Sequence, residues 1–101
     1  MSFTTQFNNN ELAITGDLTK YSIGKDWWVV EGKKLSPQIS SGNLIVDLSH
    51  VDRADSAGLA WLINLIRDTK ANDISVVLRK IPSDLLDLAK ISDASSLLPL
   101  E

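Results

Sequence analysis

Residues 54–66 read ADSAGLAWLINLI, and this stretch decides how the chain folds. Apolar side chains recur here at the three- and four-residue spacing that lines one face of an α-helix: Leu59, Leu62, Ile63 and Ile66. Asp55 and Ser56 precede them and are residue types that cap helix N-termini. The pattern predicts a helix over Ala57–Ala71 whose apolar face packs on a sheet.

The same helix carries a second set of apolar residues, for which the spacing predicts an outward position: Ala57, Trp61 and Leu65, with Ala60 beside them. An exposed Trp next to a Leu leaves apolar area unburied, at a cost of about 2 to 3 kcal/mol of free energy. Trp is also enriched at binding hot spots. We therefore expect a partner protein to cover Trp61. In the alternative interpretation, the chain terminus or the Trp27–Trp28 segment buries Trp61 within the domain.

The first part of the chain has the pattern of a β-hairpin. Side chains alternate over Phe3–Phe7 and again around Leu12 and Ile14, and Asn8–Asn10 between them is a turn signal. Gly16-Asp17 is expected to close the second strand. Residues 18–35 are harder to interpret, since the run from Trp27 to Val30 fits a strand as well as a helix.

Later segments alternate between strand and helix patterns. Asn43–Leu48 contains the continuous apolar run of a strand covered on both faces, and Ile74–Leu78 is a further β-branched run. A loop over Ser36–Gly42 precedes them, and a second helix is expected after Pro82. The tail, Ile91–Glu101, reads as a short helix or an extended cap. This order predicts an α/β fold in which helices pack on a mixed sheet.

Composition excludes several functional classes. A chain of 101 residues suffices for a single domain, 1–101, and its net charge of −3 is spread over both halves without a basic stripe for nucleic acid. Without cysteine there is no disulfide, thiolate nucleophile or Cys-based zinc site. No phosphate loop or metal-ligand spacing is present, so no cofactor is expected. The longest apolar run, Gly58–Ile66, is far short of the roughly 20 residues that span a membrane, and Met1–Asn10 lacks a signal-peptide pattern, which predicts a cytoplasmic protein.

Two motifs together resemble the STAS domain, the fold of anti-sigma-factor antagonists. Ile45–Val51 reads IVDLSHV, a buried strand ending in Asp-Leu-Ser, and Asp55–Ala60 reads DSAGLA, the Asp-Ser/Thr-x-Gly-Leu step that opens a helix in this family. The likeness extends from about Glu11 to Leu100. It implies a STAS-like mixed sheet of four to five strands with packed α-helices, and it favours a helix within residues 20–35. It also implies a regulatory binding domain without enzymatic activity.

Within the family, the chain is most similar to the MlaB group. The likeness is carried by Gly58-Leu59-Ala60, Leu88-Ala89-Lys90 and the ending Leu98-Pro99. MlaB proteins are cytoplasmic STAS subunits of the ABC transporter that maintains phospholipid asymmetry of the outer membrane. The resemblance implies a regulatory subunit, peripheral to an inner-membrane complex, that binds the ATPase subunit of the transporter and tunes its assembly or activity. MlaB proteins typically carry Thr at the position of Ser56.

The predicted partner interface is centred on the start of the helix. It comprises Asp55, Ser56, Ala57, Gly58, Ala60, Trp61, Leu65 and Asp17. Asp17 is included because strand ends gather on one rim of an α/β sheet. In the sigma-pathway members of the family, the position of Ser56 is the phosphoacceptor. The alternative function is therefore an anti-sigma factor antagonist that binds an anti-sigma factor kinase and is regulated by phosphorylation of Ser56.

Two other interpretations of these residues are a helix cap and a catalytic triad. Asp55 and Ser56 are also ordinary helix caps, a role worth about 1 kcal/mol. Ser56 with His50 and either Asp47 or Asp52 supplies the residue types of a hydrolase triad, but the G-x-S-x-G elbow is missing and a His after a strand is usually structural. No catalytic residue is therefore predicted.

Overall fold

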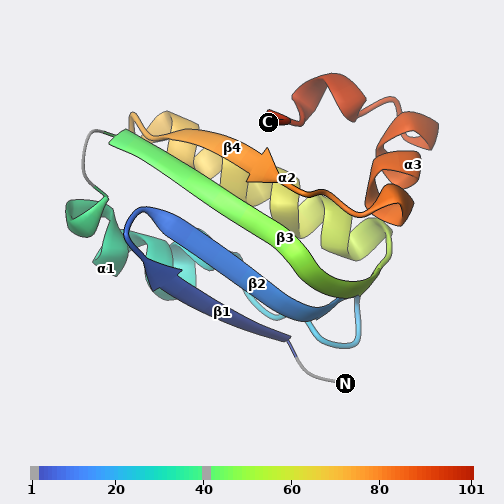
Figure 1. Ribbon diagram of the computed structural model, residues 1–101, viewed down its shortest axis with the longest axis horizontal. Helices are drawn as coiled ribbons and strands as arrows, with labels where there is room; N and C mark the ends of the chain where they lie inside the picture. Colours follow the sequence, from blue (N-terminus) through green and yellow to red (C-terminus); the bar gives the residue numbers. More distant parts are fainter. Residues whose placement is uncertain (1–2, 40–41) are drawn as a thin grey trace.

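The computed structural model describes residues 3–39 and 42–101, which form a mixed four-stranded sheet with helices packed against it (Figure 1). The strands are β1 (Phe3–Asn8), β2 (Glu11–Leu18), β3 (Asn43–Ala54) and β4 (Ser75–Arg79), in the order β1-β2-β3-β4. β1 is antiparallel to β2, whereas β2, β3 and β4 are parallel. The predicted fold class is confirmed. Part of the expected loop over 36–42, Ser40-Ser41, lies outside the described residues.

The β1–β2 hairpin turns at Asn9 and Asn10, which have φ values of 51° and 63°. A two-residue loop with two positive φ angles is a type I′ turn, and Asn tolerates that conformation better than most residues. The turn fixes the register in which Asn8 lies opposite Glu11, and that register turns Leu12 and Ile14 fully into the core.

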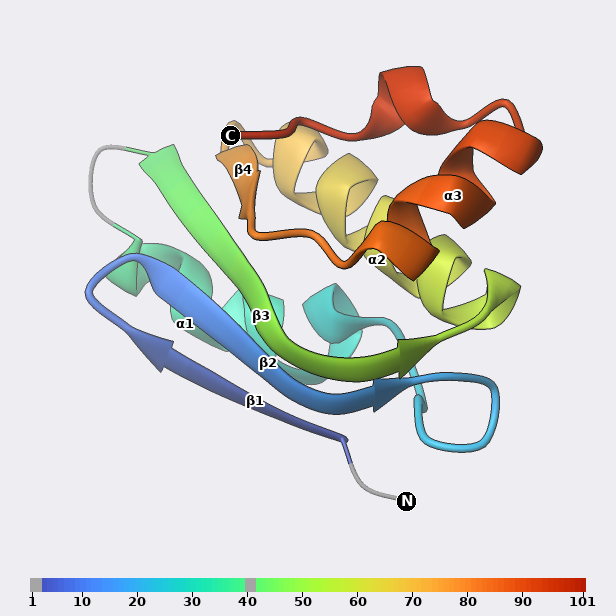
Figure 2. The ribbon, with the colours of Figure 1, turned by 45° about the vertical axis from the view of Figure 1, so that its right-hand side comes forward.

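Helices cover one face of the sheet. The longest are α2 (Ser56–Ala71) and α3 (Ser83–Ile91); a further helical segment consists of the π-helix η1 (Trp28–Gly32), α1 (Lys33–Leu35) and the 3₁₀ turn η2 (Ser36–Gln38). Figures 1 and 2 place α2 and this segment on the same side of the sheet. Residues 27–38 are helical, in agreement with the preference for a helix before residue 35, although residues 19–26 form a turn and irregular structure instead.

Two strands run further than their sequence patterns predict. β3 continues to Ala54 rather than ending at Leu48, and β2 continues past Gly16 to Leu18. The extensions pair with each other, with Thr15 opposite His50 and Leu18 opposite Ala54. Backbone pairing to a parallel neighbour thus overrides a polar local sequence, while the positive φ of Gly16, 103°, absorbs a register shift beside it.

The C-terminal residues pair with β4 at one isolated bridge. After the 3₁₀ turn η4 (Ser95–Leu97), Leu100 bridges Leu78: the Leu78 amide donates to the Pro99 carbonyl at 2.8 Å and the Glu101 amide to the Leu78 carbonyl at 3.0 Å. Arg79 pairs with both Glu11 and Glu101 at 3.2 and 3.4 Å. The tail therefore covers the β4 edge of the sheet. The sheet itself has four strands, within the predicted range of four to five.

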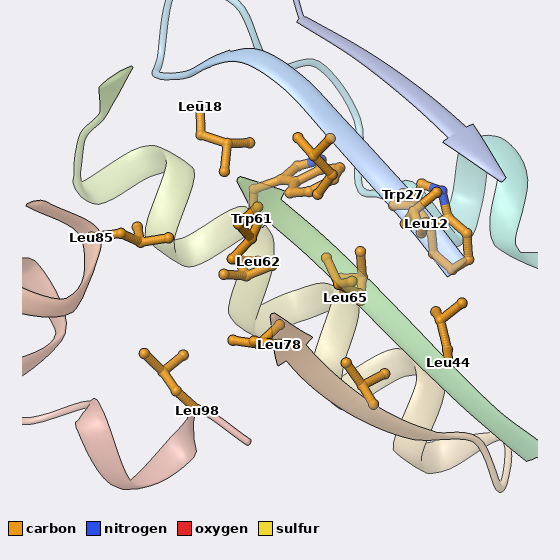
Figure 3. Close-up of a cluster of buried hydrophobic side chains, with 14 of the residues drawn as sticks. Leu12, Leu18, Trp27, Leu44, Trp61, Leu62, Leu65, Leu78, Leu85 and Leu98 are labelled. Atoms are coloured by element: carbon orange, nitrogen blue, oxygen red, sulfur yellow. The ribbon is translucent and has the colours of Figure 1, made fainter. Parts of the chain in front are cut away.

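The prediction that Trp61 and Leu65 face outward is wrong. Trp61 is 3% exposed and Leu65 is fully buried (Figure 3). At about 100° per residue, Leu65 lies only about 60° around the helix from the core residue Leu62, so the two apolar sets form one wide arc rather than opposite faces. α2 thus carries a single broad buried face.

The segment before η1 and the start of β1 close over the Trp61 side of that arc. The Trp61 indole Nε1 donates to the Lys25 carbonyl at 3.1 Å, and the Phe3 ring meets the indole edge to face at a centroid distance of 5.1 Å. Trp27, itself 2% exposed, belongs to the same core cluster. The alternative in which the Trp27–Trp28 segment buries Trp61 is therefore correct.

Gly58 allows α2 to approach the end of β2 very closely. A Cβ atom at Gly58 would lie 1.9 Å from the Leu18 carbonyl oxygen, a distance that no side chain can occupy. The obstruction is the backbone of the buried residue Leu18, whose carbonyl also accepts from the Asp55 amide, so it cannot move aside without breaking that contact. Gly58 is thus required by packing at the point where helix and sheet meet.

We expect Gly58→Ala to lower the free energy of unfolding by at least about 2 kcal/mol, because helix and strand must separate to admit the methyl group. Gly24→Ala is the matched control, since nothing lies within 4 Å of a Cβ there and its φ is not positive. Urea unfolding followed by Trp fluorescence measures both. Equal stability of the two variants would contradict the tight helix–strand contact.

Candidate functional site

Three segments meet where α2 begins. The Asp55 amide donates to the Leu18 carbonyl at 3.1 Å, which ties the end of β3 to the end of β2. The Asp55 carboxylate accepts from two amides: Oδ1 from Gly58 at 3.0 Å and Oδ2 from Lys20 at 3.0 Å. Asp55 therefore caps the helix and also holds the loop that follows β2. Figure 2 shows this loop, the end of β3, the start of α2 and α3 at one end of the molecule.

The surroundings of Asp55 favour its charged form. Burial opposes ionisation, but the backbone amides of Lys20, Gly58 and Ala57 outweigh it and the Lys20 ammonium adds to them, so the pKa of the Asp55 carboxyl lies below its ordinary value. This capping group is consequently a carboxylate at neutral pH.

Ser56 lies on the exposed arc of α2. Ser56, Ala60 and Arg67 are exposed, and Ala57 and Asn64 are partly exposed between them. Small side chains make the first two turns of this arc flat, so a partner can approach the helix backbone closely. Ser56 is also the first residue of α2, where a negative charge is stabilised by the helix dipole.

The structure divides the predicted interface residues into two groups. Ser56 and Ala60 are exposed, and Asp55 and Ala57 are partly exposed. Asp17, Gly58, Trp61 and Leu65 are buried and cannot contact a partner without rearrangement. The Asp17 carbonyl accepts a hydrogen bond from the Ser22 hydroxyl, which shapes the loop after β2. The buried members therefore position the surface rather than belong to it.

Two exposed features beside Ser56 escaped the sequence-based prediction. Tyr21 is 72% exposed in the loop after β2, with the Lys20 ammonium 5.0 Å from its ring centroid. Its segment has no regular pattern, although Tyr within a polar turn is a signal of exposure. Ile91, 83% exposed, is the last residue of α3, where the apolar repeat runs past the end of the core.

Ile91 belongs to a groove between α3 and the end of β3. The groove has a volume of about 290 Å³, with apolar walls from Ala54, Leu88 and Ile91 and an acidic rim from Asp84 and Asp87. Ala54 directly precedes the Asp55 cap, so the groove is continuous with the start of α2. We refer to Lys20, Tyr21, Ser56, Ala60 and Ile91 together as the rim surface.

The residue types of a hydrolase triad are not assembled around Ser56. The His50 Nδ1 atom lies 2.9 Å from the Ser49 hydroxyl, and the Ser49 amide donates to the Asp47 carboxylate at 3.0 Å. Burial acts against ionisation of Asp47, but bonds from Ser49 and the nearby charges of His50 and Arg79 place its pKa below the ordinary value. Over residues 3–39 and 42–101, no three His, Asp or Glu side chains are grouped as metal ligands.

We expect Asp55→Ala to destabilise the protein by about 1 to 3 kcal/mol, because both Gly58 and Lys20 lose their acceptor. Asp55→Asn retains an oxygen for the Gly58 amide but not for the Lys20 amide. Its decrease in the free energy of unfolding should therefore be about half as large. The folded-state pKa of Asp55 is lowered, so its contribution is complete above about pH 4 and disappears as pH falls through the folded-state value. Urea unfolding of the three proteins at pH 7 and pH 3 measures this, and a pH-independent difference between wild type and Asp55→Asn would contradict it.

Comparison with known proteins identifies the fold and the family of this chain. The structure of the anti-sigma factor antagonist SpoIIAA in its unphosphorylated form superimposes with a TM-score of 0.60 at 13% sequence identity, covering 88% of this chain and 82% of that one. No curated protein sequence matches significantly. Within the described part of the chain, no helix has the length and apolar character needed to cross a membrane. The profile of the STAS domain matches residues 9–101, and the chain therefore belongs to the STAS domain family, whose members are protein-interaction modules.

Proposed function

We propose that this chain is a non-enzymatic regulatory domain that binds a partner protein through the rim surface. The observation that carries the proposal is the exposed arc at the start of α2. Ser56 and Ala60 are open to solvent there, while the Asp55 carboxylate fixes the helix and the Lys20 loop relative to each other. Tyr21 and Ile91 flank this arc with two large exposed side chains. A small polar centre with aromatic and aliphatic margins suits protein recognition.

The partner that we propose first is the ATPase subunit of a phospholipid ABC transporter, as in the MlaB group. The support is the sequence likeness to that group together with the open rim surface. In this role the domain would bind one conformation of the ATPase more tightly than the other. A coupling of about 1 to 3 kcal/mol between docking and the ATPase cycle changes activity several-fold or more.

Burial explains why the sequence likeness alone does not identify this partner. Gly58, Ala89 and Leu98, which contribute to the likeness, are all buried and serve the packing of the domain. Partner choice depends on exposed positions such as Ser56, Ala60 and Ile91. An experiment on the partner must therefore vary the surface and leave the core unchanged.

A second candidate function is favoured by Ser56 itself. An exposed hydroxyl at the first residue of α2 is accessible to a kinase, and a phosphate there would lie at the positive end of the helix dipole and near Lys20. It would change the local charge by about −1.5 to −2 without disturbing the core. An antagonist of an anti-sigma factor kinase would use such a switch, and SpoIIAA, which has a similar fold, is described as an anti-sigma factor antagonist.

We expect Ala60→Glu and Ser56→Glu to abolish co-purification with the transporter ATPase from the native cytoplasm, since each places a charge in the centre of the rim surface. Ser75→Glu, at the start of β4, is the control because β4 begins at the opposite end of the parallel strands. Urea unfolding verifies that all three variants fold. If the ATPase co-purifies equally with all four proteins, docking through the rim surface is excluded.

The kinase role has its own expected outcome. Incubation with the cognate anti-sigma factor kinase and ATP should add the mass of one phosphate to the wild type and none to Ser56→Ala, as measured by intact mass spectrometry. Phosphorylation of wild type accompanied by loss of kinase binding would support the antagonist. A wild type that stays unmodified while binding the transporter ATPase would exclude it.

A further inference from the structure

The helical segment that contains η1 and α1 turns its two indoles inward and two valines outward. Gly32 makes this possible, because a Cβ atom there would lie 2.6 Å from the Trp28 ring and 2.9 Å from the Trp27 ring. The two indoles pack against the core, with their ring centroids 6.2 Å apart. Val29 and Val30 are left on the outer side of the segment, where they are 60% and 47% exposed.

The two outward valines serve neither packing nor helix formation. β-branched residues are less favourable in helices than long polar ones, so an exposed helical position gains nothing from Val29 or Val30. Val30 also borders a hollow of about 190 Å³ whose other apolar walls are Phe3, Trp27 and Trp61, so the apolar area continues towards β1. Contiguous exposed apolar area of this kind marks a surface that binds something.

Lysines surround the two valines. Lys33 and Lys34 follow Val29 and Val30 by about one helical turn and therefore lie on the same outer side, and both are exposed. Lys25, just before the segment, is exposed as well. The aliphatic stem of a lysine can lie along apolar surface while its ammonium group stays in water. We refer to these two valines and three lysines together as the valine–lysine surface.

The valine–lysine surface presents positive charge to solvent. The charged residues of the segment and of the adjacent turn of α2 are Lys25, Asp26, Glu31, Lys33, Lys34, Arg67 and Asp68. All four cations are exposed, whereas the three acids are only partly exposed. Asp26 accepts a hydrogen bond from Asn64, Glu31 accepts one from the Thr5 hydroxyl, and the neighbouring strand β1 is uncharged. Within the described part of the chain, the four cations form no ion pair.

We propose that the valine–lysine surface binds the surface of a lipid bilayer that carries anionic headgroups. Such a bilayer offers phosphates to Lys25, Lys33 and Lys34 and, just below them, hydrocarbon to Val29 and Val30. A nucleic acid offers phosphates alone and would leave the valines in water. The contact is peripheral, because only two apolar side chains reach the boundary between headgroups and acyl chains.

The bilayer contact and the proposed docking use different residues. No residue of the rim surface belongs to the valine–lysine surface, and α1 and α3 lie towards opposite ends of the molecule in Figures 1 and 2. The two proposals are therefore independent. A variant of the valine–lysine surface tests the bilayer contact without altering the start of α2.

Co-sedimentation with vesicles tests the bilayer contact. At low salt, the full chain should sediment with vesicles of equal parts phosphatidylglycerol and phosphatidylcholine but not with phosphatidylcholine alone. Each lysine near an anionic surface raises binding about fivefold, so Lys33→Gln/Lys34→Gln should bind about 25-fold more weakly than the wild type. The control Lys70→Gln/Lys90→Gln, in the last turns of α2 and α3, changes the net charge equally and should bind like the wild type.

The apolar part of the surface has its own matched pair of variants. Val29→Ser should bind several-fold more weakly, whereas Leu97→Ser, at a residue of η4 that is 55% exposed, should leave binding unchanged. Urea unfolding checks that each variant folds.

Three results would overturn the proposal. The first is a wild type that stays in the supernatant at about 5 mM accessible lipid, several times the concentration at which four such cations alone give half binding. The second is equal binding of the two double lysine variants, which would show that net charge rather than this surface attracts the vesicles. The third is a wild type that binds soluble polyglutamate but no vesicle, which would indicate an acidic protein instead of a bilayer.

Discussion

The close contact between the first turn of α2 and the last residue of β2 is the constraint on which the other features depend. Gly58 permits it, because any side chain there would overlap the Leu18 carbonyl. Asp55 maintains it from the other side, bonding to the Leu18 carbonyl through its amide and to the Lys20 and Gly58 amides through its carboxylate. One glycine and one carboxylate thus fix the angle at which the helix leaves the sheet, and with it the position of Ser56.

This contact also separates structural from recognition residues on α2. The helix is pressed so closely onto the sheet that a wide arc of its surface, including Trp61 and Leu65, is buried. Only small and polar side chains remain on the exposed arc near Ser56. The large exposed side chains near this arc come instead from neighbouring elements: Tyr21 from the loop after β2 and Ile91 from the end of α3. The proposed docking surface is therefore distributed over three segments that are far apart in sequence.

The edges of the sheet add a further level of organisation. The C-terminal residues and the Arg79 ion pairs cover β4, whereas β1 is left open and uncharged. The two edges of the same sheet thus differ in how they are protected.

Local chemistry in the sequence determined the hairpin, the extent of α2 and its cap, since Asn-Asn turns, helical periodicity and Asp before a helix act over a few residues. The STAS motif likewise indicated the family and the place of Ser56. The burial of Trp61, the length of β3 and the exposure of Tyr21 and Ile91 were decided by tertiary structure. The Trp61 indole bonds to a carbonyl 36 residues away and packs on Phe3, and the polar end of β3 is held by pairing with β2. A helical wheel has no access to such distant partners, and they alone determine whether an apolar side chain at the margin of a helix face is buried or exposed.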